Sequence, residues 1–402
     1  MKSLIKIVCT LGLAGALNLP LRSMRVEKDF AKLWPLEALK RVPSSSWGKQ
    51  EGTVREVYYE SIRFHGKPTR VFAYYALPQQ GTPPFPAMVL VHGGGGRAFP
   101  EWARLWAQRG YAALAMDTNG RGPDGKHMQD GGPEEDAEDI VKFQPFAASE
   151  AREMWTFQAV AAVILGHSWL ASQPEVDPNR TGITGISWGG YLTLIATGLD
   201  DRFKVSVPVY GCGFLYENSY WVPQFQRMAE DQRRQWIELF DPSRYVGEIR
   251  CPILFINGTT DPVYPLDSYQ KTYRQVPGRP YLSIRVDMAH SHEDGWAPPE
   301  IDAFVDSILK GGAPLTKLTE MELRQGQVRA RLQSKVKVEA GQLHYTCEAG
   351  PWQKRKWHSV PARIKEQTIT AELPEQRPLV YYLSVTDQRG LTVTTPHREL
   401  TR

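Results

Sequence analysis

The serine with the clearest chemical role lies in the hexapeptide Gly185-Ile186-Ser187-Trp188-Gly189-Gly190. Residues 180–184 before it form a short run with β-branched side chains, typical of a buried strand. Residues 191–197 after it are mostly apolar and predict the start of a helix. A sharp turn from strand to helix exposes a serine hydroxyl above the edge of a sheet, and the flanking glycines permit the close packing of that turn. We therefore predict that Ser187 is the nucleophile of an acyl-transfer reaction.

A glycine-rich loop supplies the second part of such a site. The apolar strand at residues 87–91 leads directly into His92-Gly93-Gly94-Gly95-Gly96. Glycines let the backbone approach a substrate oxygen and direct N–H groups toward it, as an oxyanion hole requires. A loop of this kind could also hold phosphate, but the sequence has neither of the nucleotide-binding glycine motifs. We predict an oxyanion hole made by the N–H of Trp188 and one N–H from Gly94 or Gly95.

An acid and a base follow in the order that such a nucleophile needs. Asp261 comes just after a predicted strand at residues 251–258 and is followed by a proline. His290 comes just after a strand-like run at residues 281–286. We predict that His290 takes the proton of Ser187 and that Asp261 holds the imidazole in the correct tautomer.

Two other residues compete for these roles. His292 is a possible base, but it lies farther from the strand and precedes Glu293, whereas His290 precedes the small Ser291. We therefore predict that His292 lies at the edge of the pocket or hydrogen-bonds the loop. Asp287 is the main rival of Asp261 for the acid.

The elements that position these residues alternate between strands and helices. This alternation predicts a mostly parallel sheet with helices on both faces. The strands are predicted at residues 54–62, 70–76, 87–91, 180–184, 205–209, 251–258 and 281–286, with helices at 147–172 and 300–310. Two insertions interrupt the pattern: residues 118–146 are predicted to form a loop beside the active site, and the aromatic-rich residues 213–240 a helical cap over it.

The character of the sequence changes at about residue 316. Short alternating runs separated by turn residues predict a small antiparallel β-sandwich of immunoglobulin or fibronectin type over residues 316–402. Trp352 and Trp357 could stack on sugars, although packing inside the sandwich is the simpler interpretation. Residues 51–315 are then the catalytic domain, and residues 17–50 are a surface segment that wraps around it.

The first sixteen residues have the composition of a cleaved leader. Lys2 and Lys6 are basic, residues 7–13 are apolar, and Ala14-Gly15-Ala16 resembles a cleavage site. The apolar stretch is too short to span a bilayer. We therefore predict a signal peptide at residues 1–16 and a secreted or periplasmic protein without stable membrane insertion.

Composition excludes several classes of partner. The chain has 402 residues, 42% of them hydrophobic, and its net charge of +4 is spread without long basic runs. These values suit two globular domains and give no reason to expect nucleic acid. Outside the leader, Cys212, Cys251 and Cys347 fit no zinc motif. We expect no metal and no cofactor, and we rank a metal-dependent esterase using His290 and His292 last, because this pair matches no established zinc-ligand motif.

Residues 54–315 resemble the α/β-hydrolases of the dienelactone-hydrolase and prolyl-oligopeptidase-like esterase group, most of all secreted bacterial acetylxylan-esterase-type enzymes. The resemblance implies a serine carboxylesterase acting on acetyl esters of plant or algal polysaccharides. Family-seven acetylxylan esterases carry a glutamine after the nucleophile and an Arg-Gly-Gln motif, so Trp188 and Arg121-Gly122-Pro123 set this chain apart from them. The motifs that carry the resemblance are residues 92–96, 111–117, 120–122, 185–190, 257–261 and 290–292.

Two alternatives remain from the sequence. Prolyl-oligopeptidase-type peptidases share this catalytic domain, but they usually carry a large β-propeller before it, and here only residues 17–50 separate the leader from the first domain. A non-catalytic carbohydrate-binding protein would not need the serine, histidine and acid that this chain retains. The sequence leaves the oligomeric state open.

Overall fold

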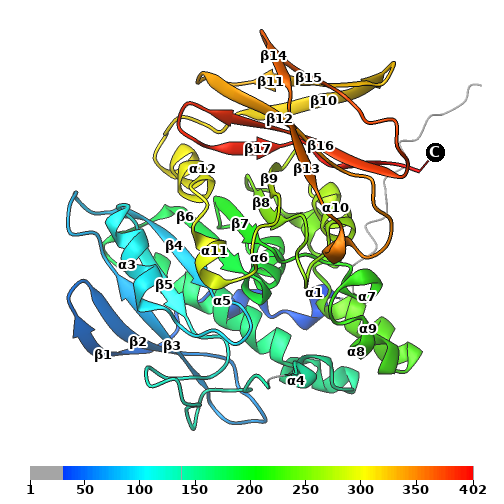
Figure 1. Ribbon diagram of the computed structural model, residues 1–402. Helices are drawn as coiled ribbons and strands as arrows, with labels where there is room; N and C mark the ends of the chain where they lie inside the picture. The colour runs from blue at the N-terminus through cyan, green and yellow to red at the C-terminus, as the bar shows by residue number, and fades with distance from the viewer. Residues whose placement is uncertain (1–29, 137, 402) are drawn as a thin grey trace, which may run out of the picture.

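A nine-stranded sheet forms the centre of the computed structural model, which describes residues 30–136 and 138–401. The strand order is β1-β2-β3-β5-β4-β6-β7-β8-β9 (Figure 1). Strands β4 to β9 are parallel to one another, and β1, β2 and β3 join antiparallel at one edge. The strands are β1 Ser45–Glu51, β2 Val54–Glu60, β3 Arg70–Ala76, β4 Phe85–Val91, β5 Ala112–Met116, β6 Val176–Ile186, β7 Val205–Val209, β8 Leu254–Gly258 and β9 Tyr281–Arg285.

Helices cover both faces of this sheet, so strands β5, β7 and β8 are buried along their whole length. Helix α5 (Trp155–Ala171) packs against α6 (Trp188–Leu199) on one face, together with α10 (Leu266–Gln275). Helices α3 (Pro100–Gln108) and α12 (Glu300–Leu309) share the opposite face, where Arg109 at the end of α3 pairs with Asp302 of α12 at 3.5 Å. The predicted α/β architecture is confirmed.

The segment before the first predicted strand is more deeply built into the fold than expected. Strand β1 pairs antiparallel with β2 and extends the sheet by one strand. Trp34 and Leu39 are buried, and the indole N–H of Trp34 donates to the hydroxyl of Tyr245 at 3.0 Å. The described part of residues 17–50 is therefore not only a surface wrap. The predicted leader at residues 1–16 lies outside the described residues.

The two insertions lie together beside the carboxyl ends of the strands. The predicted cap contains three helices, α7 (Leu215–Asn218), α8 (Val222–Arg227) and α9 (Glu230–Phe240). The other insertion is mostly loop and contains the short helix α4 (Ile140–Phe143). Phe143 of α4 packs on Phe225 and Trp236 of the cap, with ring centroids 5.2 and 5.1 Å apart. The remaining helices are α1 Phe30–Leu33, α2 Leu36–Leu39, α11 His292–Trp296, η1 Ala148–Glu153, η2 Pro242–Arg244, η3 Val246–Glu248 and η4 Trp352–Lys354.

Two antiparallel sheets follow helix α12. Their strand orders are β10-β11-β15-β14 and β13-β12-β16-β17, and β18 pairs with β16. The sheets pack face to face at Gly341 of β12, where a Cβ would lie 2.7 Å from Ile369 of β15. Trp352 and Trp357 are buried, so they serve packing and are not exposed for sugar stacking. The strands are β10 Lys317–Arg324, β11 Gln327–Gln333, β12 Val338–Thr346, β13 His358–Pro361, β14 Arg363–Lys365, β15 Thr368–Glu372, β16 Leu379–Asp387, β17 Thr392–Thr394 and β18 Arg398–Leu400.

The C-terminal sheets lie against the β9 edge of the central sheet, above it in Figure 1. The N–H of Ile284 in β9 donates to the hydroxyl of Thr394 in β17 at 3.3 Å. The N–H of Thr392 donates to the buried carboxylate of Glu300 at 2.6 Å. A protein contact at an outer strand protects its unpaired backbone groups from other chains.

Within the part of the chain that the structure describes, no helix combines the length and apolar character needed to cross a bilayer. The three cysteines there, Cys212, Cys251 and Cys347, are free thiols.

Candidate active site

Ser187 occupies the sharp turn between β6 and α6. Its backbone has φ 57° and ψ −117°, a conformation that residues other than glycine rarely adopt. Such strained backbone is found at functional turns. The glycines on either side are required by space. A Cβ on Gly185 would lie 2.2 Å from the carbonyl oxygen of Gly189, and one on Gly189 would lie 2.0 Å from that of Val91. The close approach of these backbones holds Ser187 at the turn, where the residue is half-buried.

The structure brings Ser187, His290 and Asp261 into one hydrogen-bonded chain. The Nε2 atom of His290 lies 2.9 Å from the Oγ atom of Ser187, and its Nδ1 atom lies 2.7 Å from Oδ2 of Asp261. A carboxylate can only accept here, so Nδ1 carries the proton and Nε2 is free to accept the serine proton. Asp261 is buried, and its Oδ1 accepts the N–H groups of Val263 and Tyr264 at 2.9 and 2.6 Å. These bonds fix the direction of the carboxylate.

Two tyrosines hold the imidazole of His290 in place. The ring of Tyr210 stacks on it at a centroid distance of 4.3 Å, and that of Tyr264 lies nearly parallel at 6.2 Å. The hydroxyl of Tyr210 donates to the carbonyl of Ala289 at 2.7 Å, next to the histidine. Both ring planes and the loop backbone therefore restrict the rotation of His290.

These residues meet because each follows a parallel strand. His92 follows β4, Ser187 follows β6, Asp261 follows β8 and His290 follows β9. The carboxyl ends of parallel strands meet at one edge of the sheet, and strand order reverses at β4, which lies between β5 and β6. Ligands of open α/β sheets bind in the crevice at such a reversal.

Three amides of the glycine loop already have hydrogen-bond partners, and one of them is the Gly96 N–H, which donates to the carbonyl of Gly93 at 3.1 Å. The N–H of Gly93 donates to Nε2 of His292 at 2.9 Å, and the N–H of Gly95 donates to Oε2 of Glu135 at 2.9 Å. Among the described residues, no hydrogen-bond partner is found for the N–H of Gly94. Of the two loop amides predicted for the oxyanion hole, Gly94 is therefore the available one, and the structure assigns Gly95 another partner. Trp188 is the first residue of α6, where backbone N–H groups have no partner within the helix.

His292 lies against the glycine loop and not against Ser187. Because its Nε2 accepts the Gly93 N–H, the imidazole is neutral with its proton on Nδ1. Burial lowers the pKa of His292 to about 4, which keeps this acceptor available at neutral pH. The two histidines thus face different neighbours, His290 the serine and His292 the loop.

We expect His292 and His344 to make the protein acid-sensitive. Burial lowers the pKa values of His292 and His344 to about 4, whereas an unperturbed histidine has a pKa of 6.5. Between these values the unfolded chain binds protons that the folded chain does not, so the free energy of unfolding should fall as pH drops from about 6.5 to 4. Urea unfolding at several pH values measures this. His292→Gln, whose amide oxygen can still accept the Gly93 N–H, should flatten the slope; equal stability at pH 7 and 4 would contradict the prediction.

Three charged residues of the site were not predicted from the sequence. Glu135, Asp139 and Lys142 come from the insertion that was interpreted only as a loop. One signal was present: Lys142 stands in the apolar run Ile140-Val141-Lys142-Phe143. A lysine in such a run is buried only when it is paired.

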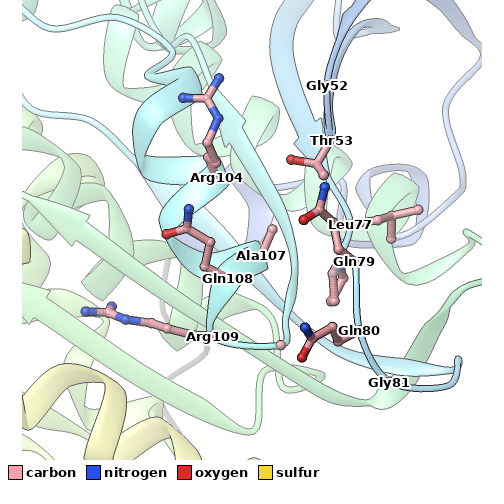
Figure 2. Close-up of a pocket in the computed structure, with 12 residues that line it drawn as sticks. Gly52, Thr53, Leu77, Gln79, Gln80, Gly81, Arg104, Ala107, Gln108 and Arg109 are labelled. Atoms are coloured by element: carbon pink, nitrogen blue, oxygen red, sulfur yellow. The ribbon is translucent and has the colours of Figure 1, made fainter.

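A surface groove of about 610 Å³ lies away from this site (Figure 2). It is lined by the β1–β2 turn, the segment after β3 and the end of α3, including Gln79, Gln80, Arg104 and Gln108. Helix α3 runs from the carboxyl end of β4 back toward the start of β5. The groove therefore lies at the amino ends of the parallel strands, whereas Ser187 lies at their carboxyl ends.

Comparison with known proteins agrees with this architecture. The chain matches the family model Acetyl xylan esterase (AXE1) over residues 21–254, and the model PhoPQ-activated pathogenicity-related protein over residues 183–348. The solved structure of the acetyl xylan esterase from Paenibacillus sp. R4 has the same fold, with a TM-score of 0.58 at 22% identity over 70% of this chain and 95% of that one.

Curated relatives match over shorter segments. The acetyl esterase Axe7A of Xylanibacter ruminicola is 24% identical over 208 residues, which are 48% of this chain and 46% of that protein. The uncharacterized peptidase YuxL of Bacillus subtilis is 24% identical over 217 residues, 48% of this chain and 28% of that protein. The chain thus spans less than half of the length of either relative.

The family model covers more than half of the chain, and the differences at Trp188 and Pro123 do not prevent the match. The protein is therefore a hydrolase of the α/β fold and belongs to the acetyl xylan esterase family.

Proposed function

We propose that this protein is a serine carboxylesterase that hydrolyses acetyl esters of plant or algal polysaccharides through an acyl-enzyme. The observation that carries the proposal is the hydrogen-bonded chain from Ser187 through His290 to Asp261, with the serine at a strained turn. A serine is activated as a nucleophile when a base accepts its proton and a third group orients that base.

The proposed reaction has two halves. In the first, Oγ of Ser187 bonds to the ester carbonyl carbon while its proton moves to Nε2 of His290. The carbon–oxygen bond to the alcohol then breaks, and His290 returns the proton to the leaving alcohol. In the second half, water gives a proton to His290 and attacks the acyl-enzyme, and the serine leaves with that proton as acetate is released.

The tetrahedral intermediates of both halves carry a negative oxygen. The N–H groups of Gly94 and Trp188 are the proposed donors to this oxyanion. Each such donor lowers the barrier by about 3 kcal/mol when it is directed at the developing charge. Asp261 stabilises the protonated His290 without taking its proton.

Family membership and an exposed aromatic side chain support the proposed substrate class. The acetyl xylan esterase family and the acetyl esterase relative favour a short acyl group. Tyr220 in the cap is 67% exposed, and its N–H donates to the carbonyl of Val263, two residues after Asp261. An exposed tyrosine beside the acid loop can stack on a sugar ring. We also propose secretion, on the basis of the leader-like residues 1–16.

A substrate panel tests the proposal. We expect p-nitrophenyl acetate to be hydrolysed faster than the butyrate and octanoate esters, and acetylated xylan to release acetate. Fluorophosphonate should label the wild type and not Ser187→Ala. Cleavage of peptide p-nitroanilides in place of esters would favour the peptidase alternative. Ester hydrolysis without labelling of Ser187 would reject the serine mechanism.

A further inference from the structure

An ionic cluster, formed by the buried Glu135 and Lys142 with the half-buried Asp139, lies beside the glycine loop. Lys142 is fully buried, and its ammonium group donates to the carboxylates of both acids. Its Nζ also lies 4.6 Å from the ring centroid of Trp155. A buried ammonium group is costly unless it is paired, so such a cluster is well defined in position and sensitive to the loss of any member.

The Glu135 side of the cluster holds the glycine loop. Oε2 of Glu135 accepts the Gly95 N–H at 2.9 Å and the side-chain amide of Asn119 at 2.7 Å. On the other side of Gly94, the Gly93 N–H is held by His292 at 2.9 Å. The N–H groups of the residues before and after Gly94 are therefore both tethered, although glycine itself gives the backbone no rigidity. These two tethers fix the residues on either side of Gly94 and so limit the directions that its N–H can take.

The Asp139 side of the cluster holds the residue after the nucleophile. Oδ2 of Asp139 accepts the indole N–H of Trp188 at 3.2 Å and that of Trp221 at 2.7 Å. Nζ of Lys142 lies 4.8 Å from the ring centroid of Trp188. The indole of Trp188 is thus fixed from two directions, and with it the start of α6.

We propose that Glu135 and Lys142 are positioning residues for the oxyanion hole. Through one lysine and two carboxylates, the cluster joins the two segments that supply the proposed donors, Gly94 and Trp188. Its role is to keep these two N–H groups directed at the oxyanion without reorganisation during the reaction, which is where such donors gain their effect. This inference rests on the proposed function of Ser187 and deepens it.

Comparison of an ester with its thionoester tests this role. Sulfur is a weak hydrogen-bond acceptor, so the thionoester gains little from an oxyanion hole. The ratio of kcat/KM for p-nitrophenyl acetate to that for its thionoacetate therefore reports the hole itself. A variant that only loses folded enzyme lowers both values equally and leaves the ratio unchanged.

We expect Glu135→Ala to lower this ratio about tenfold or more, mainly through kcat for the acetate, because a misdirected donor resembles a lost one. Glu135→Gln should retain more of the ratio, since its amide oxygen can still accept the Gly95 N–H. Lys142→Met should lower the ratio as well; if that variant does not fold, the two Glu135 variants still decide the question.

The matched control is Asp200→Asn. Asp200 is a fully buried carboxylate paired with His167 and Arg202 in the loop after α6, at the far end of that helix from Ser187. Its replacement should lower the melting temperature without changing the ratio. A wild-type ratio in both folded Glu135 variants would overturn the inference. Activity that survives Ser187→Ala, or a wild type inactive on esters, would instead reject the proposed function, and the inference with it.

Discussion

Replacement of Ser187 by alanine should lower kcat for acetyl esters by about 10⁵-fold or more, since the loss of a triad nucleophile leaves only binding and oxyanion stabilisation. The fold should be unaffected, because alanine removes only one oxygen atom from a half-buried residue. Kinetics on p-nitrophenyl acetate with melting curves of both proteins measure the two effects. Retention of a tenth of the wild-type turnover would mean that another group is the nucleophile.

Replacement of Asp261 by asparagine should lower kcat by about 10⁴-fold, with little change in the melting temperature. The side-chain amide of asparagine can donate a hydrogen bond to Nδ1 of His290. This bond favours the imidazole tautomer that carries its proton on Nε2, and a protonated Nε2 cannot accept the proton of Ser187. Both Oδ1 contacts, to the N–H groups of Val263 and Tyr264, can be kept by the amide oxygen. Turnover and stability of the purified variant provide the measurement.

Asp287→Asn is the matched control for that experiment. Asp287 was the other candidate for the acid, but in the structure it accepts the hydroxyl of Thr260 at 3.2 Å, and the carboxylate bonded to His290 is that of Asp261. We expect Asp287→Asn to retain most of its activity. A larger loss in this variant than in Asp261→Asn would exchange the two assignments.

The sequence predicted the fold well where the residues of a strand or helix themselves show the apolar pattern of that element. The strand Arg70–Ala76 and the strand Val205–Val209 have the predicted bounds, because most of their side chains are apolar and buried on both faces of the sheet. Strand β1 was missed because Ser45–Glu51 is exposed along almost its entire length. It is a strand only through its pairing with β2, which its own residues do not indicate.

The same distinction applies to the site. Ser187, Asp261 and His290 could be proposed from the sequence because each follows a strand and the order of the three is diagnostic. The ionic cluster could not, because its partners are far apart in the chain: Gly95 and Glu135 are separated by 40 residues, and Asp139 and Trp188 by 49. Periodicity describes neighbours in sequence and contains no information on such pairings.

The contact of β17 with β9 limits how this chain could be recombined with its relatives. Thr392 and Thr394 bond Glu300 and Ile284, so the C-terminal sheets and the catalytic sheet share a seam that involves both backbone and side chains. A chimera that joins a foreign C-terminal segment at residue 315 would leave the Glu300 carboxylate buried without its amide partner. A chimera made within this family should therefore take α12 and β17 from the same parent protein.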